Sequence, residues 1–215
     1  MHIPDGFLTP AVWGAFDVVG AAAVAVGLYQ TSKSLQEKAV PMMGVLSAFV
    51  FAAQMLNVPV SGGTSGHFLG GALVGIVLGP WTGLVVMAII LSVQCLVFQD
   101  GGIAALGANI FNMGILGCWL SAYLFRLMHT LWPGTRGRFC ASFTASWLTI
   151  LLASLSCAAQ LTYSGVVSMK LAVVVIGGVH SILGLVEGLV TATVIASLAR
   201  TRPDLLNLAE PGKIT

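Results

Sequence analysis

Charged residues are scarce in this 215-residue chain, and their scarcity excludes a water-soluble globular protein. Only 7% of the residues are charged and 57% are hydrophobic, whereas a soluble domain carries about 25% charged residues. A surface of this composition is stable against lipid rather than against water. The net charge of +2 is too small and too scattered to indicate a nucleic-acid-binding protein.

Paired cysteines and a nucleotide-binding loop are also missing. The four cysteines stand singly within apolar stretches, at positions 95, 118, 140 and 157. Without a CxxC pair, neither a disulfide framework nor a zinc site is indicated, and we expect small buried packing residues. The chain contains no GxxxxGK[ST] motif, so it cannot hydrolyse ATP through a P-loop and is not expected to be an enzyme.

The N-terminus lacks the features of a signal peptide. The opening MHIPDGFLTP contains no Lys or Arg, and no cleavage pattern precedes the first apolar run. Methionine removal requires a small second residue, and His2 is large. We therefore expect Met1 to be kept, with its free amine.

Long hydrophobic runs are what the chain has in abundance. Seven apolar segments predict an all-α membrane protein, a bundle of seven transmembrane helices. They cover residues 11–29, 41–57, 66–79, 81–98, 106–128, 139–162 and 171–198. The third is short and is followed at once by Pro80, which predicts either a tight hairpin or a partly re-entrant pair with the fourth. One membrane domain spans residues 1–200, and residues 201–215 form a polar tail.

The basic residues orient this bundle. Eight of them fall on one side of seven spans, and only Lys170 falls on the other. The positive-inside rule makes the basic side cytoplasmic. The N-terminus is then predicted outside and the C-terminus inside.

Potential metal ligands gather on the predicted outer side, beginning with the N-terminal segment 1–10. The free amine of Met1, the amide nitrogen of His2 and its imidazole can close adjacent chelate rings on one metal ion. One more nitrogen would complete a square plane, a geometry typical of Ni²⁺ or Cu²⁺. His67, in the outer loop NVPVSGGTSGHF (57–68), is the candidate for that nitrogen.

Four stretches carry a family resemblance. The opening MHIPDGFL and the segments SGGTSGHFLGG, GPWTGLVVMAIILSVQ and GGIAALGANIFNMG resemble the cobalt/nickel S-components (CbiM/NikM) of energy-coupling-factor (ECF) transporters. The resemblance extends over most of residues 1–200. It implies a seven-helix bundle with its N-terminus outside, and it places the metal ligands on Met1, His2 and His67.

The resemblance also implies how such a protein works. The chain is expected to be the substrate-binding subunit of an ATP-driven importer, which captures Ni²⁺ or Co²⁺ from outside. The ion is the transported substrate, and no cofactor is expected. The expected partners are a transmembrane coupling protein, cytoplasmic ATPases and a small auxiliary membrane protein. The MHIPDG opening places nickel ahead of cobalt.

Two other functions compete. Gly63-Thr64-Ser65-Gly66 matches the GxSG of a rhomboid-like intramembrane protease, with Ser65 and His180 as its dyad. That hypothesis leaves the N-terminal motif unexplained. A stand-alone cation channel or secondary transporter would use Asp17 and Glu187, but no repeated charges mark a pore.

Polar residues within the spans have open roles. His180 and Glu187 share a helix face, where they form either an ion path or a hydrogen-bonded packing pair. Asn109 and Asn112 are predicted to support the metal site by hydrogen bonds.

Overall fold

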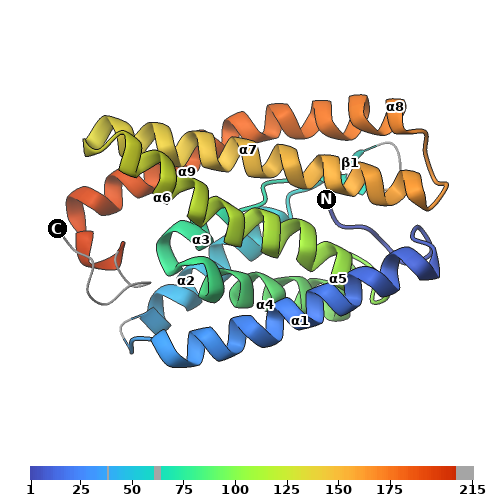
Figure 1. The fold of residues 1–215 in the computed structure, drawn as a ribbon, viewed down its shortest axis with the longest axis horizontal. Helices are drawn as coiled ribbons and strands as arrows, with labels where there is room; N and C mark the ends of the chain where they lie inside the picture. The colour runs from blue at the N-terminus through green and yellow to red at the C-terminus, as the bar shows by residue number, and fades with distance from the viewer. Residues whose placement is uncertain (38, 61–63, 207–215) are drawn as a thin grey trace.

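The computed structural model describes residues 1–37, 39–60 and 64–206. Its helices lie side by side along the long axis of the molecule (Figure 1). Five are long and apolar enough to cross a membrane: Pro10–Ser34, Pro80–Phe98, Leu106–Leu131, Gly134–Tyr163 and Met169–Thr201. With two shorter helices they make seven, so the predicted all-α membrane bundle is confirmed.

The helical boundaries follow the apolar runs and their breakers. The first helices are α1 (Pro10–Ser34), α2 (Ala39–Gln54), α3 (Gly71–Leu78) and α4 (Pro80–Phe98). The fifth is continuous through α5 (Leu106–Asn109), the π-helical η1 (Ile110–Leu120) and α6 (Ser121–Leu131). The sixth is α7 (Gly134–Tyr163), and the seventh runs through α8 (Met169–Ala172), the π-helical η2 (Val173–Gly177) and α9 (Gly178–Thr201).

The third predicted segment is the main correction. Only residues 71–78 are helical, and an eight-residue helix is about 12 Å long, too short to cross a core of about 30 Å. All eight residues are buried, so α3 lies inside the bundle. Residues 64–66 instead form strand β2 (Thr64–Gly66), which pairs antiparallel with β1 (Val58–Val60).

The predicted tight hairpin between α3 and α4 is present in the structure. Gly79 turns the chain with a φ of 86°, a left-handed value that side chains disfavour. The two helices then approach so closely that a Cβ on Gly83 would lie 2.9 Å from Cα of Gly75. Two glycines therefore permit a contact that larger residues would prevent.

The outer surface of the bundle is apolar, as contact with lipid requires. Large hydrophobic side chains are exposed along α1 and α9, including Val18, Leu28, Ile182 and Leu189. Three of the cysteines are buried as predicted, but Cys140 is exposed, because it lies on an outward face of α7. The 3-10 helix η3 (Pro203–Leu205) follows α9, and residues 207–215 of the predicted tail lie outside the described residues.

Candidate metal site

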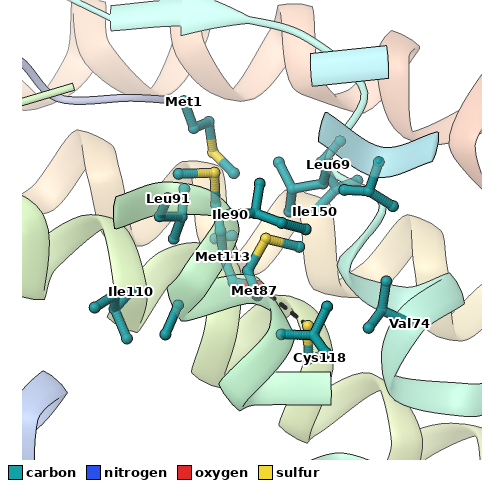
Figure 2. Close-up of a cluster of buried hydrophobic side chains, with 14 of the residues drawn as sticks. Met1, Leu69, Val74, Met87, Ile90, Leu91, Ile110, Met113, Cys118 and Ile150 are labelled. Carbon is teal, nitrogen blue, oxygen red and sulfur yellow. Dashed lines mark hydrogen bonds between the residues drawn. The ribbon is translucent and has the colours of Figure 1, made fainter. Parts of the chain in front are cut away.

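The N-terminal segment folds back into the bundle instead of extending from it. Figure 1 places the N-terminus well inside the molecule, near β1 and α7. The Met1 side chain is fully buried within the hydrophobic core, and Figure 2 shows it extending toward Met87 and Met113. The residue that carries the terminal amine is thus anchored by its own side chain.

Hydrogen bonds hold the rest of this segment in place. The Asn109 side chain accepts the N–H of Ile3 at 2.9 Å and donates to its carbonyl at 3.1 Å. The Asp5 carboxylate accepts the N–H groups of Ile103 and Ala104 at 3.0 and 2.8 Å. The segment is therefore held by the start of the fifth helix and the loop before it.

The three predicted ligand residues come together. The Met1 amine nitrogen lies 2.5 Å from Nε2 of His67. The imidazole rings of His2 and His67 are stacked, with centroids 4.6 Å apart. All three residues are buried, although His67 is 66 positions from Met1 in the sequence.

Neighbouring hydrogen bonds select the tautomer of each histidine. His67 Nδ1 lies 2.8 Å from the Phe68 carbonyl oxygen, which can only accept, so Nδ1 carries the proton and Nε2 presents a lone pair toward the amine. His2 Nε2 lies 3.1 Å from Oε1 of Gln94. In this orientation of the Gln94 amide, Nε2 of His2 donates to the amide oxygen, and Nδ1 of His2 holds the lone pair. That Nδ1 makes no hydrogen bond in the described part of the chain, and its contact with Oδ1 of Asp100 lacks hydrogen-bond geometry.

Burial keeps these nitrogens neutral. Desolvation lowers the pKa of the Met1 amine to about 5. It also lowers the pKa of His2 to about 3 and that of His67 well below its usual range, with the nearby terminal amine adding to both shifts. At neutral pH the amine and both imidazoles therefore hold lone pairs rather than positive charge, which is the form that binds a metal.

Asp100 adds a carboxylate at the edge of the site. Its Oδ1 lies 3.3 Å from Nδ1 of His2, and burial raises its pKa. A pocket of about 340 Å³, lined among others by His2, Ser65 and Asp100, adjoins this edge. No three His, Cys, Asp or Glu side chains of the described residues form a metal-binding group.

The proposed protease dyad does not form. The Ser65 hydroxyl accepts from the Met1 amine at 3.4 Å, while His180 donates from Nδ1 to the Ile176 carbonyl at 2.7 Å. His180 interacts with the main chain of Ser65. A Ser–His nucleophile requires a contact between the hydroxyl and the imidazole.

The intramembrane carboxylates have structural partners. Asp17 accepts the N–H of Gly107 at 2.9 Å, which joins α1 to α5. Glu187 accepts the N–H groups of Leu69 and Gly70. Asp17 and Glu187 lie on separate helices and bind backbone groups. Among the described residues His180 bonds to Ile176 and Glu187 to Leu69 and Gly70, so the alternative of a hydrogen-bonded His180–Glu187 pair is not observed.

Sequence reasoning placed one supporting residue correctly and missed others. Asn109 binds the N-terminal segment as expected, but Asn112 pairs with Gln160 at 2.9 and 3.0 Å. The role of Gln94 was missed, and so was that of Thr64, which donates to the His2 carbonyl at 3.3 Å. A glutamine within an otherwise apolar span is costly unless it has a partner, and this signal could have identified Gln94.

Comparisons with known proteins place the chain. Residues 2–205 match the family described as the cobalt uptake substrate-specific transmembrane region, CbiM. The chain is 42% identical over 217 residues to a putative fused nickel transport protein NikMN of Archaeoglobus fulgidus, covering 100% of this chain and 71% of that protein. It is 33% identical to the cobalt transport protein CbiM of Sorangium cellulosum, covering 96% and 95% of the two chains.

A solved structure agrees with this placement. The crystal structure of a transition metal transporter superposes with a TM-score of 0.86 at 31% identity, covering 93% of each chain. The chain therefore belongs to the CbiM family. It is a multi-pass membrane protein, the substrate-specific transmembrane component of a cobalt/nickel uptake transporter.

Proposed function

We propose that this chain captures one Ni²⁺ ion through four nitrogens: the Met1 amine, the His2 amide nitrogen, His2 Nδ1 and His67 Nε2. The observation that carries the proposal is the pair of tautomer-selecting hydrogen bonds, from His67 to Phe68 O and from His2 to Gln94. Each leaves unprotonated the nitrogen that the chelate needs. Histidine ligands in metal sites are commonly oriented in this way through their second nitrogen.

The donor set favours nickel over cobalt. An amine, a deprotonated amide and two imidazoles suit the square-planar geometry that Ni²⁺ adopts readily. Loss of the amide proton is promoted by late divalent ions, so Ni²⁺ stabilises this set more than Co²⁺ does. The relative of Archaeoglobus fulgidus is also described as a nickel transport protein.

The ion enters from outside the cell. Of the seven basic residues that the structure describes, six lie at one end of the bundle: Lys33, Arg126, Arg136, Arg138, Arg200 and Arg202. The loop with Asp100 and the turn before α8 lie at the opposite end, where the N-terminal segment joins α1 (Figure 1). The positive-inside rule assigns the basic end to the cytoplasm, so the pocket beside His2 opens outward, from a prokaryotic inner membrane.

Release into the cell requires partners. The sequence has no P-loop motif, so ATP hydrolysis belongs to separate cytoplasmic ATPases, joined through a transmembrane coupling protein as in ECF transporters. The fused NikMN relative extends beyond the region it shares with this chain. Its name indicates an auxiliary N component, and a small auxiliary membrane protein is therefore among the proposed partners.

The test is nickel titration of the His67→Ala variant, with His129→Ala as the matched control at the opposite end of the bundle. His67→Ala should weaken nickel binding by at least 100-fold while the protein keeps its helical content, since one of four ligands is lost. His129→Ala should bind as the unaltered protein does. Unchanged affinity in His67→Ala would remove this residue from the site.

A further inference from the structure

The backbone after His67 is bound by a buried carboxylate from a distant helix. Glu187, on α9, is 1% exposed. Its Oε2 accepts the N–H of Leu69 at 2.7 Å and its Oε1 accepts the N–H of Gly70 at 3.1 Å. A buried carboxylate that binds two backbone N–H groups fixes the segment that carries them.

One peptide unit joins this carboxylate to the ligand histidine. The carbonyl of Phe68 accepts the Nδ1–H of His67 at 2.8 Å, and the N–H of the same Phe68–Leu69 peptide is donated to Glu187. The peptide is planar and rigid, so its carbonyl cannot turn without breaking the bond to the carboxylate. Hydrogen bonds in such a chain also polarise one another.

Two neighbouring features of the described part of this loop act on other groups than the Phe68 carbonyl. The Gln54 side chain donates to the Leu69 carbonyl at 2.6 Å, which belongs to the next peptide unit. Gly70 adopts a φ of 72°, and a Cβ there would lie 2.6 Å from the Val50 side chain. A glycine in this conformation allows the turn into α3 but does not impose it.

We propose that Glu187 is a positioning residue for the metal site. It orients the Phe68–Leu69 peptide, and this peptide holds His67 in the Nδ1–H tautomer, with Nε2 aimed at the Met1 amine. The inference rests on the proposed function, because it assigns His67 Nε2 to the metal. It extends the familiar carboxylate–histidine–metal arrangement by one intervening peptide. It also means that a shift of α9 relative to the loop would move a metal ligand.

Nickel titrations of four variants test the proposal. They are Glu187→Gln, His67→Ala, the double variant, and Glu37→Gln, which makes the same chemical change in the exposed loop between α1 and α2. Glu187→Gln should weaken binding about 10- to 100-fold and shift the visible absorption band of bound Ni²⁺. Glu37→Gln should change neither. In the His67→Ala background, Glu187→Gln should change the affinity less than about 3-fold, because its effect passes through His67.

A loss of the same size in both backgrounds, or wild-type binding by Glu187→Gln, would overturn the role of Glu187 while leaving the four-nitrogen site intact. Wild-type binding by His67→Ala would instead overturn the proposed function itself.

A second measurement needs no variant. In metal-free protein labelled with ¹⁵N-histidine, the imidazole chemical shifts report which nitrogen carries the proton. The proposal requires Nδ1–H for His67. Nε2–H at His67 would refute it.

Discussion

Extending the chain by two residues before Met1, for example Gly-Ser, should abolish high-affinity nickel binding although no side chain is removed. Acylation converts the amine into an amide, which removes one of the four proposed nitrogens. The extension would also have to displace neighbouring groups, because Met1 is fully buried and its nitrogen lies 2.5 Å from Nε2 of His67.

The size of the effect follows from two contributions. Burial of a methionine side chain stabilises by about 1.5–3 kcal/mol, and each 1.4 kcal/mol corresponds to a tenfold change in affinity. Displacing Met1 from its core position therefore weakens binding roughly 10- to 150-fold before the lost ligand is counted. With that ligand lost as well, the total should exceed 1,000-fold.

The assay is calorimetric nickel titration of the extended protein and of a protein with the same two residues added at the C-terminus. The second addition is the control, since it follows the polar end of the chain after α9. Normal affinity in the N-terminally extended protein would refute the amine as a ligand. Equal loss in both would indicate a general effect of the extension rather than a blocked site.

Three further predictions follow from the contacts around the site. The pKa of the Met1 amine is about 5 and those of both histidines are lowered, so between pH 8 and 6 only the amide has to lose a proton when nickel binds. Nickel affinity should therefore fall about tenfold per pH unit over this range, and more steeply below about pH 5, where the amine is also protonated. Titrations that show no change of affinity with pH would contradict the account. Asp100→Asn removes the negative charge beside His2, so it should weaken nickel binding roughly tenfold at low salt and slow association. Stopped-flow association rates that match the wild type would exclude a role of Asp100 in attracting the ion. Asn109→Ala removes two hydrogen bonds to Ile3, each worth about 1 kcal/mol, so nickel affinity should fall about 5- to 30-fold, and unchanged titrations would show that docking of the segment does not limit binding.

The sequence predicted the helices well because a segment that crosses lipid must be a long apolar run, which is easily recognised. Each of the five long spans lies within about five residues of its predicted boundaries, since apolar runs and breakers such as Pro80 and Pro133 mark their ends. The error at residues 66–70 has a physical reason. His67-Phe68-Leu69 is apolar enough to resemble part of a span, but protein rather than lipid surrounds it, and extended backbone is tolerated there.

The sequence predicted which candidate ligands would meet, and Asn109 among their supporting residues, but not the other residues that hold them. Met1, His2 and His67 could be proposed because few side chains bind metals and these lie on the same predicted side of the membrane. Their partners Gln94 and Glu187 lie on α4 and α9, far along the chain, and no local pattern shows that a carboxylate on α9 binds the peptide after Phe68. Burial also lowers the pKa values of the amine and of both imidazoles below neutral pH, an effect of the folded environment that the sequence does not show.

The central claim is a four-nitrogen nickel site built on the N-terminus, and X-ray absorption spectroscopy of the native-terminus protein loaded with one equivalent of Ni²⁺ tests it most directly. The account predicts stoichiometric binding, four nitrogen neighbours in a square plane, two of them imidazoles, and a yellow diamagnetic optical spectrum. A folded protein that binds no nickel, or an ion surrounded by six oxygens, would contradict it.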